Sequence, residues 1–226
     1  MVKVKICGIT NWADARKSVE EGADFLGFNF YRESPRYIAP AAAARIIKRL
    51  PAGVKAVGVF VNESEENILA TARKAGLDQV QLHGDETPEM VSRLRREFPI
   101  TKALRVRRKL QQAQLTAYAG VDTFLLDGFD GKLHGGTGKT FDWRLIRRAG
   151  LKKRLFLAGG LTPQNIGEAI RVGKPYAVDV CSGVETRPGK KDPKRIAALM
   201  AAVKASGSSA EKPRARSSRA KVGKKR

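Results

Sequence analysis

Short apolar runs alternate with longer amphipathic segments along the first 204 residues. The apolar runs are rich in aliphatic and β-branched residues and predict strands over residues 2–7, 25–30, 56–61, 79–83, 102–106, 123–127, 155–158 and 177–181. The amphipathic segments predict helices over residues 12–21, 41–50, 65–75, 88–98, 110–119, 142–149, 163–172 and 193–204. Residues that can cap helix N-termini, such as Asn11 and Thr87, precede several of these helices.

A regular alternation of strands and helices implies βαβ units and a parallel sheet. Eight such units in about 200 residues favour one closed (β/α)₈ TIM barrel, with residues 1–204 as a single α/β domain. A doubly wound open sheet is the alternative. In a barrel of this kind, polar residues at the C-terminal ends of the strands form the active site.

The composition narrows the class of protein. A hydrophobic content of 42% in 226 residues excludes a wholly disordered chain and allows a core without disulfide or metal staples. No apolar run reaches the roughly 18 residues of a membrane-spanning helix, and the N-terminal segment is unlike a secretory signal. Two cysteines and two histidines leave little material for a disulfide framework or a metal site. These features predict a cytoplasmic protein without a bound metal.

The formal net charge of +22 is unevenly distributed along the chain. Residues 205–226 contain eight Lys or Arg and one Glu, have almost no apolar residues and show no helical or strand period, so we expect a disordered basic tail. Such a tail binds nucleic acid or an acidic partner in some proteins and is a dispensable, solvated extension in others. The absence of aromatic residues in it argues against nucleic-acid binding.

Polar residues and glycines stand at the ends of the predicted strands. Cys7 ends the first, His83 the fourth, and Asp127 the sixth, and Asp179 lies in the eighth. Glycine-bearing segments with Gly159, Gly160, Ser182 and Gly183 follow the seventh and eighth strands. Backbone N–H groups can approach an anion closely at such positions, so these segments predict a phosphate site. Tight turns alone are the other explanation for the glycines.

A nucleotide-binding P-loop is excluded. The sequence Gly138-Lys139-Thr140 follows a predicted strand, but the P-loop pattern needs a glycine five residues before Gly138, where this chain has Leu133. We interpret the glycine-rich loop over residues 128–140 as a cover beside Asp127.

Taken in order, these segments resemble the phosphoribosylanthranilate isomerase family over residues 2–200. The matching motifs are KICGIT (5–10), GFNFY (27–31) with SPR (34–36), VGVFVN (57–62), VQLHG (80–84), LD (126–127), GGTGKTFDW (135–143), AGGL (158–161), VDVCSGVE (178–185) and PGKKD (188–192). The resemblance implies a TIM barrel that converts an aminoaldose into an aminoketose in tryptophan biosynthesis, without cofactor or metal. It implies a small phosphorylated substrate and a monomer or homodimer.

The same resemblance implies the roles of individual residues. Cys7 is expected to be the general base and Asp127 the general acid, and Arg36 is expected to bind the substrate carboxylate with its planar guanidinium. His83 and Asp179 are expected to line the pocket, and Gly159, Gly160, Ser182 and Gly183 to bind the phosphate. We interpret Cys181 as a packing residue.

The chemistry sets requirements on the two reacting groups. Ring opening needs a protonated acid, so burial or nearby negative charge should raise the pKa of Asp127. Proton abstraction needs a thiolate, so a helix N-terminus or a nearby cation should lower the pKa of Cys7. An aminoaldose isomerase of histidine synthesis, which uses two aspartates, is the enzymatic alternative, and a nucleic-acid or acidic-partner binder with a barrel scaffold is the non-enzymatic one.

Overall fold

Eight parallel strands close into a barrel in chain order, which confirms the predicted TIM barrel. The computed structural model describes residues 1–106, 112–128, 143–144 and 154–208. Lys5 lies opposite Phe25 on one side and Asp179 on the other, so the first strand pairs with both the second and the last. The strands are β1 (Lys3–Cys7), β2 (Phe25–Asn29), β3 (Lys55–Phe60), β4 (Gln79–Leu82), β5 (Ile100–Val106), β6 (Thr123–Gly128), β7 (Arg154–Ala158) and β8 (Ala177–Val180).

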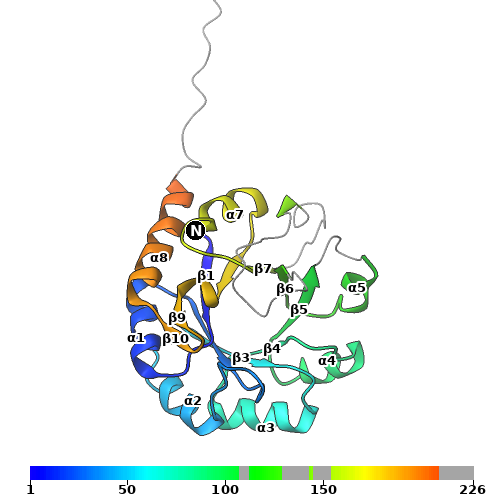
Figure 1. Ribbon diagram of the computed structural model, residues 1–226. Coiled ribbons are helices and arrows are strands. Elements are labelled where there is room, and N and C mark those ends of the chain that lie inside the picture. Colours follow the sequence, from blue (N-terminus) through cyan, green and yellow to red (C-terminus); the bar gives the residue numbers. More distant parts are fainter. Residues whose placement is uncertain (107–111, 129–142, 145–153, 209–226) are drawn as a thin grey trace, which may run out of the picture.

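Helices surround the strands (Figure 1). They are α1 (Trp12–Glu21), α2 (Pro40–Ile47), α3 (Glu65–Ala75), α4 (Pro88–Leu94), α5 (Gln112–Ala117), α7 (Ile166–Gly173) and α8 (Pro193–Ser208). Most of the helix predicted over residues 142–149 lies outside the described residues. Within the described ranges, no helix is both long and apolar enough to cross a membrane.

Helix α8 is longer than predicted. It continues four residues past Lys204, so the first four residues of the expected tail are helical. Val203 is buried on the barrel and the Ser206 hydroxyl donates to the Val203 carbonyl, so the helix is anchored close to its end. Extending an anchored helix by one turn costs little, because nucleation has already occurred. The remaining tail, residues 209–226, lies outside the described residues.

Helix α7 begins three residues later than predicted. The Asn165 side chain accepts a hydrogen bond from the Thr162 N–H and donates to the Gly160 carbonyl. These bonds hold residues 162–165 in a turn, and the helix starts only at Ile166. The sequence pattern predicted a helix start at residue 163, and the competing asparagine turn overrides it.

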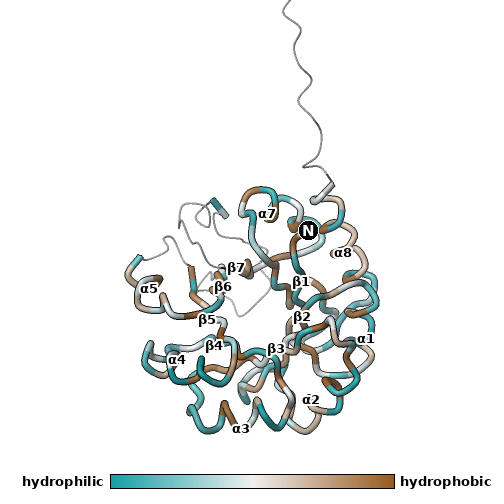
Figure 2. Tube along the Cα trace, turned by 180° about the vertical axis from the view of Figure 1, so that it is seen from behind, coloured by the Kyte–Doolittle hydropathy of each residue, from teal (hydrophilic) through white to brown (hydrophobic). Residues whose placement is uncertain are grey.

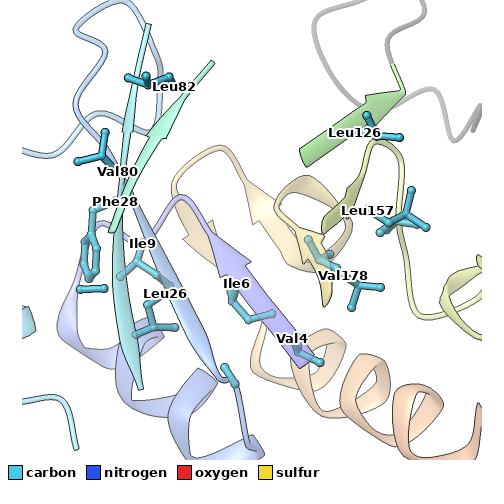
Figure 3. Close-up of a cluster of buried hydrophobic side chains, with 14 of the residues drawn as sticks. Val4, Ile6, Ile9, Leu26, Phe28, Val80, Leu82, Leu126, Leu157 and Val178 are labelled. Carbon is cyan, nitrogen blue, oxygen red and sulfur yellow. The ribbon is translucent and has the colours of Figure 1, made fainter. Parts of the chain in front are cut away.

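Alternate residues of each strand face opposite sides of the barrel wall. One set packs beneath the helices, and Figure 3 shows this layer with Ile6, Leu26, Val80, Leu126 and Val178 among its members. The hydropathy colouring in Figure 2 shows hydrophobic strands and many hydrophilic stretches on the surrounding helices. The other set faces the barrel interior, where Ala103, Leu125, Phe156 and Ala177 form a second apolar cluster.

A repeated Gly-X-Asp motif fixes the N-terminal ends of three strands. The aspartates of these motifs are Asp24, Asp78 and Asp122, each just before an even-numbered strand. Each accepts a hydrogen bond from a backbone N–H of the preceding odd-numbered strand, at Val4, Ala56 and Ile100 respectively. Each is also paired with a cationic side chain, Lys3, Lys55 and Arg95 in turn. These contacts tie neighbouring strands at the end opposite the predicted active site, which suits a role in stability.

Candidate active site

Three strands each carry two inward-facing polar side chains, spaced two residues apart. These pairs are Lys5 and Cys7 at β1, Gln81 and His83 at β4, and Asp179 and Cys181 at β8. Asp127 lies near the C-terminal end of β6. Because all the strands are parallel and the barrel is closed, these groups gather at one end of the barrel.

Cys7 lies half-buried at the end of β1 among cationic groups. A hydrogen bond from Cys181 is the largest influence that lowers its pKa, and the charges of Lys5 and Lys191 act in the same direction against the opposing effect of burial. The pKa of Cys7 therefore lies well below that of an ordinary thiol. Its sulfur occupies space that only glycine leaves open at position 27, where an added Cβ would lie 2.7 Å from the Cys7 Sγ.

Cys181 lies beside Cys7 and Lys191, which are polar contacts that its interpretation as a packing residue did not include. Its Sγ lies 3.8 Å from the Glu185 Oε1, and interaction with Cys7, together with burial, holds the pKa of Cys181 well above its usual range. The Lys191 Nζ lies 3.9 Å from the Cys181 Sγ and also donates to the Cys7 carbonyl. The two thiols thus divide their roles, with Cys7 favoured as the thiolate and Cys181 as the donor.

Asp127 projects into the same end of the barrel from β6. Its Oδ2 lies 3.3 Å from the His83 Nε2, and both side chains remain partly exposed. Gly159 stands directly behind it, since a Cβ at this glycine would lie 2.8 Å from the Asp127 Oδ1 and 2.4 Å from the Gly128 nitrogen. Gly159, expected in the phosphate site, therefore makes room for the carboxyl group of Asp127.

Asp179 forms a buried ion pair with Lys5 at the floor of the site. The Lys5 Nζ is 2.9 Å from the Asp179 Oδ2 and also 2.9 Å from the Gln81 Oε1. Burial raises the pKa of Asp179 to about 6, with the negative charges of Cys7 and Asp127 adding to the effect and Lys5 opposing it. Among the described residues, no partner reaches the buried Asp179 Oδ1, which leaves one acceptor available to a ligand.

Arg36 comes from the loop after β2 and is held by Glu185. Its Nε and Nη2 donate to the two Glu185 oxygens at 3.0 to 3.1 Å and 2.7 Å. Burial opposes the charge on Glu185, but Arg36 and Lys191 outweigh it and lower the pKa of this carboxyl. One edge of the guanidinium is therefore already occupied, so a substrate carboxylate would have to approach the opposite edge.

A cavity of about 340 Å³ adjoins the ends of β7 and β8. It is lined by Gly160, Leu161, Thr162, Pro163, Gln164, Ser182, Gly183 and Arg195. A Cβ on Gly183 would lie 1.9 Å from the Leu161 carbonyl oxygen, so only glycine fits between these loops. Three of the four residues expected to bind phosphate thus line one cavity, together with a cationic side chain that the sequence did not single out.

The sequence analysis gave no role to Lys5, Gln81, Glu185 and Lys191, which complete the polar surroundings of the site. Lys5 and Gln81 could have been found, because each lies two residues before a predicted site residue on the same strand and so faces the same side. Lys191 and Glu185 lie in a short hairpin, β9 (Glu185–Arg187) and β10 (Lys190–Lys191), that no strand pattern indicated. In the described part of the chain, His, Cys, Asp and Glu side chains form no group of three that could hold a metal ion.

Comparison with known proteins connects this geometry to one family. The family model for N-(5'-phosphoribosyl)anthranilate isomerase matches residues 4–202. The N-(5'-phosphoribosyl)anthranilate isomerase of Citrifermentans bemidjiense is 50% identical over 204 residues, which cover 90% of this chain and 98% of that protein.

Solved structures agree with the sequence relatives. Monomers generated from the dimeric phosphoribosylanthranilate isomerase of Thermotoga maritima superpose with a TM-score of 0.82 at 45% identity, covering 91% of this chain and all of that one. A phosphoribosyl anthranilate isomerase in complex with reduced 1-(o-carboxyphenylamino)-1-deoxyribulose 5-phosphate superposes with a TM-score of 0.81 at 44% identity, again over 91% and 100% of the two chains. By fold, sequence and the residues gathered at the barrel end, this chain belongs to the phosphoribosylanthranilate isomerase family.

Proposed function

We propose that Cys7 is the general base and Asp127 the general acid of the isomerase reaction of this family. That reaction converts N-(5-phosphoribosyl)anthranilate into 1-(2-carboxyphenylamino)-1-deoxyribulose 5-phosphate in tryptophan biosynthesis. The observation that carries the assignment is the surroundings of Cys7, where two lysine cations and a thiol donor favour a thiolate at the same barrel end as Asp127.

Ring opening is the first step. The Asp127 carboxyl donates its proton to the ribose ring oxygen as the bond from that oxygen to C1 breaks. The lone pair on the anthranilate nitrogen forms the C1–N double bond, so a protonated Schiff base results. The phosphate and carboxylate of the substrate add negative charge near Asp127 and favour the protonated acid before this step.

Proton removal from C2 follows. The Cys7 thiolate takes the proton, and the C–H electron pair forms a C1–C2 double bond while the C1–N π pair returns to nitrogen. The resulting enolamine loses its O2 proton and gains one at C1, which gives the aminoketose. One proton must then pass from the Cys7 thiol to the Asp127 carboxylate, because an isomerisation leaves the enzyme unchanged.

Arg36 anchors the anthranilate carboxylate in this proposal. The Glu185 contacts hold the guanidinium in one orientation, and a charged donor that is already oriented loses less side-chain entropy when a ligand binds. The ligand in the related complex carries a carboxyphenyl group and a phosphate, which are the two anions that the present site must recognise.

The phosphate is assigned to the cavity beside β7 and β8. Gly160, Ser182 and Gly183 have small side chains or none, so their backbone N–H groups are open to an anion in the cavity. Arg195 supplies a positive charge at the same cavity. His83 faces Asp127 and Asp179 is bonded to Lys5 at the same barrel end. The Asp179 Oδ1, which no described residue reaches, is available to accept a hydrogen bond from a substrate hydroxyl or amine.

Turnover assays on purified variants test the proposal. Cys7→Ala and Asp127→Asn are expected to lower kcat by orders of magnitude with unchanged circular dichroism, using phosphoribosylanthranilate generated in situ. Assaying the aminoaldose substrate of histidine synthesis in parallel separates the two isomerase activities. Rates near wild type in either variant would overturn the residue assignment.

The assembly and the location remain predictions. A related enzyme from Thermotoga maritima is described as dimeric, and a monomer or homodimer is our expectation for this chain. Light scattering of the purified protein distinguishes the two. A cytoplasmic location, tested by cell fractionation, accompanies this proposal, and a role of the basic tail in binding nucleic acid or an acidic partner is tested by truncation below.

A further inference from the structure

A chain of polar contacts crosses the floor of the site from Lys5 to Asp127. The Lys5 Nζ donates to the Gln81 Oε1 at 2.9 Å, and the Gln81 Nε2 lies 3.0 Å from the His83 Nδ1. The His83 Nε2 lies 3.3 Å from the Asp127 Oδ2. Lys5 and Gln81 are almost completely buried, so water does not compete for the hydrogen bond between them, whereas His83 and Asp127 are partly exposed.

The direction of every hydrogen bond in this chain is set by the lysine. An ammonium group has donors only, so the Gln81 atom that faces Lys5 must be the carbonyl oxygen. The amide NH₂ of Gln81 therefore faces His83, and it can only donate. The His83 Nδ1 must then be the acceptor, which places the proton of the neutral ring on Nε2 and directs it to Asp127.

The tautomer of His83 matters for the acid step. With the proton on Nε2, the ring donates to the Asp127 Oδ2, and an acidic proton on Asp127 is left on Oδ1. With the proton on Nδ1, the Nε2 lone pair would face the carboxyl group and accept that acidic proton itself. Only the first arrangement keeps the proton available to the substrate ring oxygen.

We propose that Gln81 is a positioning residue for the acid: oriented by Lys5, it holds His83 in the Nε2-protonated tautomer, which orients Asp127 for proton donation. This inference rests on the proposed role of Asp127. It deepens that role, because it links the groups around the base to the acid through Lys5, which is bonded to both Asp179 and Gln81.

The tautomer can be measured without any turnover. The chain has two histidines, so nitrogen NMR of the imidazole rings gives two sets of signals, and substitution of His134 assigns them. We expect His83 in the wild-type protein to show a protonated Nε2 and an unprotonated Nδ1. Gln81→Met keeps the length of the side chain but cannot donate, so the ring should show a mixture of tautomers or Nδ1 protonation.

A second variant guards against misfolding of the first. Gln81→Glu still accepts from Lys5 but presents a carboxylate, which can only accept, to the His83 Nδ1, so Nδ1 should carry a proton in this variant. The other groups around the ring are Asp127 on β6 and Arg105 on β5, whose Nη2 lies 3.4 Å from the His83 carbonyl, and both variants leave them unchanged. Gln79→Met is the matched control, because Gln79 lies two residues earlier on β4 and donates to Thr101.

Kinetics complete the test. Gln81→Met is expected to lower kcat roughly ten- to a hundredfold with little change in KM, and to add no further loss in an Asp127→Asn background. Gln79→Met should leave both the tautomer and kcat at wild-type values. An unchanged tautomer in Gln81→Met, or a changed tautomer with wild-type kcat, would overturn the inference. Wild-type activity in the Asp127→Asn single variant would instead refute the role of Asp127. The NMR result would then still decide whether Gln81 sets the tautomer of His83.

Discussion

Substitution of Gly159 by alanine tests how the barrel positions Asp127. Gly159 has a φ of +89°, and a Cβ at this position would lie 2.4 Å from the Gly128 nitrogen and 2.8 Å from the Asp127 Oδ1. Both distances are too short for real atoms, so the end of β6 must shift or the Asp127 side chain must turn. We therefore expect Gly159→Ala to displace the proposed acid.

The structure sets the size of the effect. A non-glycine residue with left-handed backbone costs about 1–2 kcal/mol, and relief of the overlap adds to this cost. A loss of about 2 kcal/mol lowers the Tm of a domain of this size by roughly 4–8 °C. A displacement of about 1 Å at a reacting group lowers the rate on the order of a hundredfold.

Differential scanning calorimetry and turnover of phosphoribosylanthranilate measure the two effects. Gly167→Ala is the matched control, since Gly167 lies in α7 and a Cβ there would meet nothing within 4 Å. In that helix alanine should be neutral or stabilising by up to about 1 kcal/mol, with unchanged kcat. A Gly159→Ala enzyme with wild-type kcat would show that Gly159 does not control the placement of Asp127.

Four further predictions concern other parts of the molecule. In steady-state assays, Arg36→Met should raise KM more than Asp127→Asn does, because Arg36 is proposed to bind the substrate carboxylate and Asp127 to act in the reaction step. Equal KM values in the two variants would contradict the binding role of Arg36. Asp78→Ala should lower the free energy of unfolding in urea by about 1–2 kcal/mol, because it leaves the Ala56 N–H without its acceptor. The kcat should not change, since Asp78 lies at the end of the barrel opposite the site. An unchanged unfolding midpoint would contradict the stabilising role of Asp78. The ultraviolet absorbance of the Cys7 thiolate can be measured as the difference between wild type and Cys7→Ala. Because the pKa of Cys7 is lowered in the folded protein, this absorbance should persist below pH about 8.5, where an unperturbed thiol takes up its proton. Loss of the thiolate signal near pH 8.5 would contradict the effect of the surrounding cations. Removal of residues 209–226 should leave kcat/KM unchanged, and any retention of nucleic acid in low-salt filter assays should be lost with them.

The architecture was predictable from the sequence pattern, and the resemblance to the family singled out Cys7 and Asp127 as the proposed reacting groups. Strand and helix periods repeat eight times, and the parallel barrel rule then places strand ends such as Cys7 and Asp127 together. Two helix boundaries differ from the prediction for separate reasons: a competing asparagine turn delays the start of α7, and anchoring of Val203 on the barrel extends the end of α8.

The groups that adjust the site were not predictable in the same way. Lys5 contacts Asp179, which lies 174 residues later, and Lys191 donates to the Cys7 carbonyl across 184 residues. No local pattern reports such pairs. The ion pair between Arg36 and Glu185 was equally unpredictable from local sequence, because it depends on the β9–β10 hairpin packing against the loop after β2.

The most direct test of the proposed division of labour is the rate with substrate deuterated at C2 of the ribose. If Cys7 removes this proton, Cys7→Ser should turn over slowly and show a primary isotope effect, since proton abstraction then limits the rate. Asp127→Asn should turn over slowly without one, because ring opening precedes cleavage of the C2–H bond. An isotope effect in Asp127→Asn and none in Cys7→Ser would contradict the assignment of base and acid.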